Sequence, residues 1–355
     1  MRYKGFIAVL LTGVLLLSSA TVFAGTGKRI ATAGATELLI PVGARSTALS
    51  GANTAGVFGI DAIYWNPAGV AMAESNTEAM FSHQNWIGDI DVNYLAVATQ
   101  VSRVGAIGLS LKTLSFGDIM ETTVTNPEGT GKVFSPTYLT VGLTYSRKMT
   151  DRILFGATAK LVTERIMSTG AQGVGFDFGL QYVSPVSGLK LGVVLTNFGT
   201  NMKFIGTDLE RRVIMPGTEA GTVQTSVSIP TASFDLPSQL KLGVSYALNL
   251  GEQINLDLMG AFVNNAYAYD QYIAGAELSL RDFLFLRGAY SLAFKEGLGE
   301  NESGKFVSAS EDYLFGPSFG LGVKFNVGFP VTLDYAYRLT EFFNNAQFFC
   351  LTVGF

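Results

Sequence analysis

The stretch QLKLGVSYALN, residues 239–249, alternates strictly between apolar side chains and polar or small ones. Its apolar positions share one face, and the other face carries glutamine, lysine, glycine, serine and asparagine. A period of two residues predicts a β-strand with two different faces. The same alternation recurs along the chain, in YLTVGLTYSR (138–147), VGFDFGLQY (174–182), GLKLGVVLTNF (188–198), SFGLGVKFN (318–326) and PVTLDYAYRLT (330–340).

The composition indicates that the apolar faces of these strands meet lipid. The chain is 48% hydrophobic and only 15% charged, whereas soluble domains carry about 25% charged residues. A Lys or Arg on the lipid side of a barrel costs roughly 2–4 kcal/mol near mid-bilayer. The charged residues of the strands are therefore predicted to face a lumen. They are Lys112, Lys160, Asp177, Lys190, Lys241, Asp257, Glu277, Arg287, Lys324, Asp334 and Arg338.

Strand counting predicts an all-β fold, a transmembrane antiparallel β-barrel of about fourteen strands. The predicted strands are 76–86, 90–101, 104–114, 137–148, 152–164, 172–183, 188–198, 238–249, 253–264, 269–281, 283–295, 314–326, 330–340 and 346–355. The three longest connections, 115–136, 199–237 and 296–313, all follow odd-numbered strands. Barrels have long outer loops and short periplasmic turns, so odd strands are expected to lead outward from the periplasm.

The N-terminus predicts export. Residues 1–24 combine Arg2 and Lys4 with a short apolar run and small residues before Gly25, which is typical of a cleaved signal peptide. The alternative is a membrane anchor, although the run is short for a helical span of about 20 residues. No later segment is long and apolar enough for such a span. A closed barrel in the bacterial outer membrane is then expected, because its strands satisfy every backbone group between them.

Several function classes are unsupported by the sequence. The chain contains one Cys and one His, too few for a zinc site of the usual kind, and no convincing set of catalytic residues. The net charge of −4 argues against a nucleic-acid partner. The sequence thus predicts no enzyme, no metal and no cofactor, and outer-membrane lipid as a partner.

The last strand, AQFFCLTVGF at 346–355, alternates outward to a terminal phenylalanine. This ending resembles the C-terminal signal that the barrel assembly machinery reads, which makes that machinery a predicted partner. The residues of the predicted assembly signal are Phe349, Leu351, Val353 and Phe355.

Residues 25–75 do not alternate, and they precede the predicted barrel at 76–355. Their run Tyr64-Trp65-Asn66-Pro67-Ala68-Gly69 suits neither a helix nor a strand, because Pro67 lacks an amide donor and glycine is conformationally free. A fourteen-stranded lumen is wider than the eight-stranded one that side chains just fill. We expect this segment to start on the periplasmic side and fold back into the lumen as a plug.

The stretch LLIPVGARSTALSGANTAGVFGIDAIYWNPAGVA, residues 38–71, resembles the N-terminal signature of the PorV/PorQ family, a branch of the FadL-like outer-membrane barrels. The matching positions define a plug motif of Arg45, Tyr64, Trp65, Asn66, Pro67, Ala68 and Gly69. The resemblance implies a fourteen-stranded barrel with an N-terminal plug.

Three functions remain open. PorV/PorQ-like members serve the type IX secretion system and pass exported cargo to a surface complex, which would make secretion components and exported proteins partners. FadL-like relatives carry fatty acids or other hydrophobic small molecules. The third possibility is a plugged barrel that carries nothing. An exposed apolar surface at the outer rim would favour the first function, and an apolar pocket under the outer loops beside a strand kink would favour the second.

Overall fold

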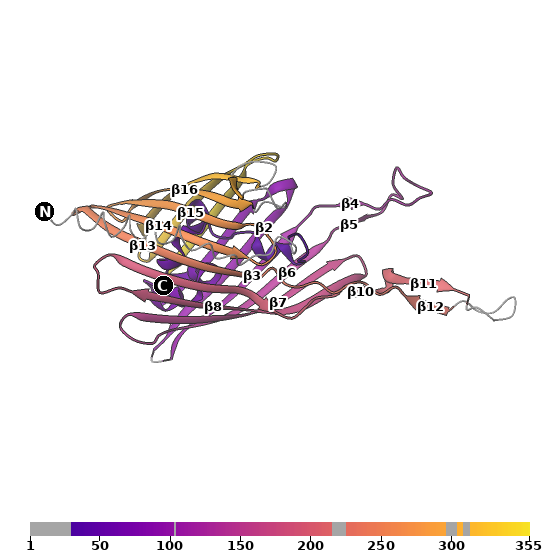
Figure 1. Cartoon of the computed structure of the whole chain (residues 1–355), viewed down its shortest axis with the longest axis horizontal. Coiled ribbons are helices and arrows are strands. Elements are labelled where there is room, and N and C mark those ends of the chain that lie inside the picture. Colours follow the sequence, from indigo (N-terminus) through magenta and orange to yellow (C-terminus); the bar gives the residue numbers. More distant parts are fainter. Residues whose placement is uncertain (1–29, 103, 215–224, 296–303, 308–312) are drawn as a thin grey trace.

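A computed structural model describes residues 30–102, 104–214, 225–295, 304–307 and 313–355. In these residues fourteen antiparallel strands form one closed barrel (Figure 1). Pairing of β1 with β20 and of β8 with β9 completes the ring. The barrel strands are β1 (Thr77–Asn85), β2 (Asp91–Val101), β3 (Gly105–Ser115), β6 (Thr137–Lys148), β7 (Ile153–Ile166), β8 (Thr169–Val183), β9 (Leu189–Gly199), β13 (Gln239–Gly251), β14 (Ile254–Asn265), β15 (Asp270–Leu280), β16 (Leu284–Lys295), β18 (Phe315–Asn326), β19 (Pro330–Thr340) and β20 (Ala346–Gly354).

The predicted barrel is confirmed strand by strand. The largest shift lies between β7 and β8, which extend toward each other as far as Ile166 and Thr169. Only residues 167–168 connect them, and Met167 adopts a positive φ of 52° there. The sequence suggested a longer connection because Ser168 and Gly170 resemble loop residues, but in the structure they form the tight end of a long hairpin.

The connections divide the barrel into two ends. The long connections leave one end, here called the long-loop end, and the opposite short-turn end carries tight turns such as 252–253 and 281–283. Two hairpins project beyond the long-loop end, at the right of Figure 1. They pair β4 (Ile119–Met120) with β5 (Val133–Phe134), and β11 (Glu210–Val213) with β12 (Thr225–Ser228). Two further short strands, β10 (Ile205–Gly206) and β17 (Lys305–Val307), extend the sheet at β8 and β16.

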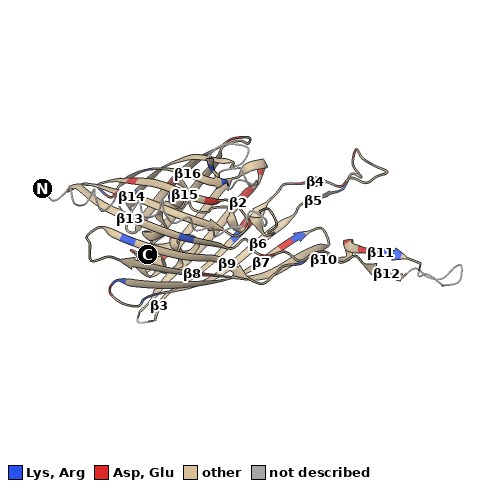
Figure 2. Cartoon of the chain, in the orientation of Figure 1, with Lys and Arg blue, Asp and Glu red and all other residues tan. Residues whose placement is uncertain are grey.

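The two faces of the wall differ as the alternation predicts. Along β13, Leu240, Leu242 and Val244 are exposed on the outside, while Lys241 and Gly243 are buried on the inside. Charged residues are sparse on the strands, as Figure 2 shows. An apolar outer face is favourable in contact with lipid. In water the same face would expose a large apolar surface, which is unfavourable.

The lumen is filled by the N-terminal segment, defined here as residues 31–76. It consists of short helices: η2 (Thr36–Leu39), α2 (Ala44–Ala48), η3 (Ala52–Ala55), η4 (Gly59–Asp61), α3 (Ala62–Trp65) and η5 (Pro67–Met72). Single turns η6 (Ile87–Asp89) and η7 (Thr207–Leu209) lie in the loops.

None of the helices in the described parts of the chain is long and apolar enough to cross a membrane.

The direction of the segment differs from the expectation. Its described start lies at the long-loop end, where Ala31 N donates to Tyr267 O at 3.0 Å and Gly34 N donates to Asp235 O at 3.2 Å. Its end lies at the short-turn end, where Thr77 N donates to Phe355 O at 3.1 Å. The segment therefore crosses the lumen from the long-loop end to the short-turn end. These hydrogen bonds to loop carbonyls are tertiary contacts, and no local pattern in the sequence encodes them.

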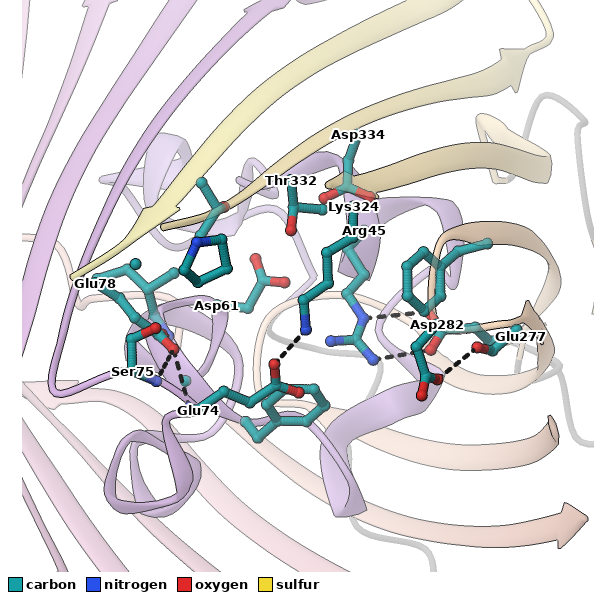
Figure 3. Close-up of a pocket in the computed structure, with 18 of the residues that line it drawn as sticks. Arg45, Asp61, Glu74, Ser75, Glu78, Glu277, Asp282, Lys324, Thr332 and Asp334 are labelled. Carbon is teal, nitrogen blue, oxygen red and sulfur yellow. Dashed lines mark hydrogen bonds and ion pairs between the residues drawn. The ribbon is translucent and has the colours of Figure 1, made fainter. Parts of the chain in front are cut away.

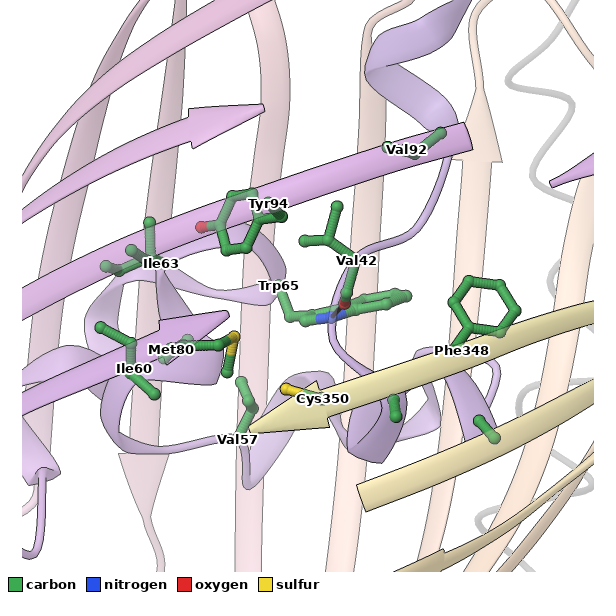
Figure 4. Close-up of a cluster of buried hydrophobic side chains, with 14 of the residues drawn as sticks. Val42, Val57, Ile60, Ile63, Trp65, Met80, Val92, Tyr94, Phe348 and Cys350 are labelled. Atoms are coloured by element: carbon green, nitrogen blue, oxygen red, sulfur yellow. Dashed lines mark hydrogen bonds between the residues drawn. The ribbon is translucent and has the colours of Figure 1, made fainter. Parts of the chain in front are cut away.

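The core of the molecule forms between the segment and one side of the wall (Figure 4). Apolar side chains of the segment pack there against inward-facing side chains of β1, β2 and β20. The labelled members are Val42, Val57, Ile60, Ile63 and Trp65 from the segment, and Met80, Val92, Tyr94, Phe348 and Cys350 from the wall.

Candidate functional site

The plug motif lies in the lumen, close to the wall. The Asn66 amide donates to Thr54 O at 2.8 Å and to Leu180 O of β8 at 3.4 Å, and its oxygen accepts from Ala68 N at 3.2 Å. Asn66 is thus the N-cap of η5, with Pro67 as its first residue, an arrangement that suits both residue types. This one side chain ties the turn both to the segment and to the barrel.

Glycines of the wall make room for this turn. A Cβ atom at Gly179 of β8 would lie 2.1 Å from the Asn66 side-chain oxygen, and one at Gly156 of β7 would lie 2.2 Å from the Pro67 carbonyl carbon. No side chain larger than hydrogen fits at these distances. The small residues on the inner face of these strands therefore serve the fit between wall and segment.

The aromatic residues of the motif close the segment on itself. Trp65 Nε1 donates to Val42 O at 2.9 Å, and the Tyr64 hydroxyl is within hydrogen-bond distance of Leu38 O and Ile40 O, at 3.0 and 2.9 Å. The two rings meet edge to face with centroids 5.2 Å apart. Buried Trp and Tyr need such partners for their polar atoms, and here carbonyls from the first half of the segment supply them.

Polar side chains of the wall satisfy further carbonyls of the segment. Short helices leave many backbone groups without an internal partner. The wall provides hydrogen bonds from Lys112 to Glu37 O (2.7 Å), Gln100 to Val70 O (2.9 Å), Ser146 to Ala68 O (2.8 Å), Gln181 to Val57 O (2.8 Å) and Ser318 to Ala48 O (2.9 Å). The polar inner face thus binds the backbone of the segment.

An ion-pair chain joins the segment to three strands. Arg45 forms two hydrogen bonds with Glu277 of β15, at 2.8 and 3.1 Å. Glu277 also pairs with Arg287 of β16, which in turn pairs with Asp334 of β19. All three wall residues are buried. Each charge has an opposite partner, as buried charges require.

These residues border a cavity of about 460 Å³ at the short-turn end, the charged cavity (Figure 3). Its lining includes seven carboxylates and three cationic side chains. They are Asp61, Glu74, Glu78, Asp257, Glu277, Asp282 and Asp334, with Arg45, Arg287 and Lys324.

Most of these carboxylates have partners. Glu78 accepts hydrogen bonds from the backbone N–H groups of Ile60 (2.7 Å), Glu74 (3.1 Å) and Ser75 (3.4 Å), and Lys324 pairs with Glu74. Burial raises the pKa of Asp61 to about 7, an effect that the neighbouring Arg45 opposes.

A second cavity of about 410 Å³, the aromatic cavity, lies between the segment and the wall at the long-loop end. Tyr64 and Trp65 line it from the segment, and Tyr269, Tyr313 and Phe315 line it from the wall. Lys241 and Arg338 also line it, whereas no acidic side chain of the described residues does.

The structure places all eleven predicted lumen charges on the inner side. Lys112, Lys241 and Arg338 contact the segment or line the aromatic cavity, and Lys160 pairs with Asp177 at 2.7 Å. Asp257 and Lys324 line the charged cavity, and Lys190 interacts electrostatically with Asp257.

Three of the predicted assembly-signal residues lie on the outer face of β20, where Phe349 and Leu351 are exposed and Val353 is half-buried. Phe355 directly follows β20 and is also exposed.

The sequence does not predict one pair of buried glutamates. Glu37 of the segment and Glu164 of β7 are both buried and interact with each other near the long-loop end. Burial first, and then the charge of Glu164, raise the pKa of Glu37 to about 8. Glu164 falls in the alternating pattern of β7, but Glu37 lies outside any pattern, so only the folded chain shows that they meet.

The chain is similar to one known protein family and to several solved structures. Residues 23–182 match a family model described as type IX secretion system protein PorV. No protein of curated function matches the sequence.

Solved structures resemble the chain in fold. The TodX deltaS2S3 mutant, a monoaromatic hydrocarbon channel, aligns with a TM-score of 0.53 and 15% identity over 88% of this chain and 97% of that chain. The P. putida toluene transporter TodX gives 0.52 and 14% over 88% and 98%. A Pseudomonas aeruginosa FadL homologue aligns at 0.49 and 11% over 88% and 98%. The first half of the chain is therefore similar to the PorV family of type IX secretion system proteins, and the whole barrel shares the fold of the FadL-like channel TodX.

Proposed function

We propose that this barrel binds exported proteins of the type IX secretion system at the outer face of the membrane. The observation that carries the proposal is the exposed apolar surface of the two projecting hairpins. Met120, Val124 and Val133 are exposed on the β4–β5 hairpin, and Val227 and Ile229 on or beside β12. Lipid explains exposed apolar residues on the barrel wall, but the hairpins extend past the barrel end (Figure 1). Exposed apolar patches outside lipid mark interaction sites.

The hairpins also offer backbone hydrogen bonds. Among the described residues, β11 pairs only with β12 and β4 only with β5. Each hairpin therefore has outer edges on which an extended segment of a cargo protein could add a strand. Apolar side chains would add to the affinity of such an edge, and its backbone groups would orient the cargo.

We also propose that the N-terminal segment seals the lumen. The segment fills the barrel with buried side chains, and Asn66 and Pro67 lie directly against β7 and β8. A barrel that binds proteins on its outer loops needs no open pore, and a leaking one would harm the cell. We propose further that residues 1–24 are a cleaved leader, that Phe349, Leu351, Val353 and Phe355 guide assembly, and that the protein has no enzymatic role.

The test uses the full chain in phosphatidylcholine nanodiscs and proteins exported by the type IX system of the same cell. Val227→Ser together with Ile229→Ser, and separately Val124→Ser with Val133→Ser, should reduce cargo co-purification severalfold. Val186→Ser is the matched control, because Val186 is equally exposed but lies in a turn at the short-turn end. Unchanged cargo binding in both hairpin variants, or an equal loss in the control, would contradict the proposal.

A second function, a channel for hydrophobic small molecules, has its own supporting observation. An apolar pocket of about 350 Å³ lies near the long-loop end, lined by Leu39, Trp86, Leu114 and Phe116 among others. The pairing of β8 with β9 is also irregular beside Asp177, where Asn197 has a φ of 57°. The P. putida toluene transporter TodX shares the fold. Uptake of radiolabelled toluene or laurate by cells with and without the protein separates this function from cargo binding.

A further inference from the structure

The aromatic cavity contains buried cations without anionic partners. Lys241 of β13 is 9% exposed and Arg338 of β19 is 8% exposed. In the described part of the chain, the Lys241 ammonium has no hydrogen bond or ion pair, and Arg338 Nε has no hydrogen-bond partner. The carboxylate that acts on Lys241, Asp177, is already held 2.7 Å from the Lys160 ammonium.

Aromatic rings provide the nearest compensation for these charges. The Lys241 ammonium lies 5.5 Å from the centre of the Trp65 ring, and the Arg338 guanidinium lies 4.0 Å from the centre of the Phe315 ring. The Tyr313 hydroxyl also interacts with Arg338. Cation–π contacts return less free energy than the removal of a cation from water costs. Two such cations at one cavity without a carboxylate indicate a site that an anion completes.

The other walls of the cavity define the rest of the ligand. Trp65 and Tyr269 line the cavity, and aromatic side chains suit a ligand that itself carries a ring. Gln239 and Gln271 add amide groups to the lining. The volume of about 410 Å³ falls within the range of small-molecule sites. A purely aliphatic ligand fits this cavity less well, because it would leave Lys241 and Arg338 without an anion. The apolar pocket beside Trp86 is a separate space.

We propose that the aromatic cavity binds a small organic anion that carries a ring. Its carboxylate or phosphate lies between Lys241 and Arg338, and its ring lies against Trp65. This site is independent of the hairpins proposed to bind exported proteins, so either function can fail while the other stands.

Intrinsic fluorescence can report on this site. The chain has only two tryptophans, Trp65 and Trp86. In a Trp86→Phe background, Trp65 becomes the only tryptophan, and it lines the cavity. The probe is 4-nitrophenyl phosphate, whose nitrophenyl ring absorbs tryptophan emission. Titration into the full chain in phosphatidylcholine nanodiscs should give saturable quenching, whereas neutral 4-nitrophenyl glucoside should not.

Charge variants connect the quenching to the two cations. Lys241→Gln and Arg338→Gln should each raise the half-saturation concentration of the probe by about tenfold or more. Each variant removes a charge-assisted hydrogen bond to the anion. Lys241→Arg keeps the charge and should stay within a few-fold of the parent. Lys324→Gln removes a cation from the charged cavity and should leave quenching unchanged. Heat-modifiable migration on gels verifies that each variant is folded.

Three results would overturn the proposal. The first is saturable quenching by the neutral glucoside equal to that by the phosphate. The second is unchanged affinity in both Gln variants while Lys241→Arg and Lys324→Gln also behave like the parent. The third concerns the ring of the ligand. If inorganic phosphate or laurate displaces the probe at a lower concentration than phenyl phosphate does, the ring contributes nothing to binding.

Discussion

The charged cavity and the aromatic cavity lie toward opposite ends of one lumen, and they treat buried charge in opposite ways. In the charged cavity Glu277 is shared by Arg45 and Arg287, and backbone N–H groups hold Glu78. In the aromatic cavity Lys241 and Arg338 meet rings and no carboxylate. Paired charge fixes the segment to the wall, whereas unpaired charge is available to a ligand. One lumen thus combines an anchor and a candidate binding site.

The largest effect is expected from breaking the anchor. Glu277→Gln removes the carboxylate shared by two arginines and breaks the ion pair between Arg45 and the wall. Removing one partner of a buried pair costs about 3–5 kcal/mol. The unfolding midpoint in guanidinium, followed by heat-modifiable migration, should fall accordingly.

The control lies in the same cavity. Asp257 lines it without a hydrogen bond or ion pair to the described residues, so Asp257→Asn should change stability far less. A similar loss in both variants would show that overall charge, and not the ion-pair chain through Glu277, stabilises the barrel.

A second prediction compares the lumen with the lipid face. Leu333 is exposed on the outer face of β19, and the adjacent Thr332 lines the charged cavity. Leu333→Arg should cost about 2–4 kcal/mol if Leu333 lies near mid-bilayer. Thr332→Arg should cost less, because it adds a cation to a cavity rich in carboxylates.

Gly243 cannot serve as the inner position in this comparison. A Cβ atom there would lie 2.9 Å from Ala55 N of the segment, so an arginine would clash whatever its charge. Equal costs at Leu333 and Thr332 in folded reconstituted protein would mean that the assigned faces are wrong.

The sequence predicts the wall well because lipid imposes a strict rule on it. Lipid-facing positions near mid-bilayer favour apolar side chains, so the period of two recurs along the fourteen strands and indicates their number and parity. Leu242 and Lys241 are neighbours in the sequence and lie on opposite faces in the structure. The turn between β7 and β8 was missed because Ser168 and Gly170 fit a loop as well as a hairpin end.

The contents of the lumen could be predicted only in part. The run around Asn66 and Pro67 indicated a rigid turn, and the alternation indicated which charges face inward. Which groups pair depends on strand positions far apart in the sequence, as for Arg45 and Glu277, 232 residues apart. The role of Ser146 and Gln181 as donors to the segment has no sequence signal, because such residues also line water-filled lumens.

A third prediction concerns the turn that we propose seals the lumen. Asn66 is fully buried and bonds both the segment and β8. Asn66→Ala should cost about 1–3 kcal/mol, since it leaves Thr54 O and Ala68 N without this partner. Replacing Trp65-Asn66-Pro67 by Gly-Ser-Gly should also raise ion conductance in planar bilayers while the barrel still assembles. Conductance at the parental level would mean that this turn does not seal the lumen.

The smallest expected effect is a pH-dependent loosening at the start of the segment, near the aromatic cavity. Glu37 faces the carboxylate of Glu164 and the Lys112 ammonium, and its pKa is raised from 4.5 to about 8, chiefly by burial. A raised pKa means that the docked state favours the protonated acid. Docking is therefore strongest below about pH 4.5 and weakens as pH rises toward 8. The effect stays local, because the ion pair between Arg45 and Glu277 holds the rest of the segment. A spin label at the exposed Thr36, introduced as Thr36→Cys with the buried Cys350→Ala, should become more mobile between pH 5 and 9. With Glu37→Gln the spectrum should stay immobile throughout this range. Greater mobility at acid pH, or the same slope in the Gln variant, would assign the titration to a group other than Glu37.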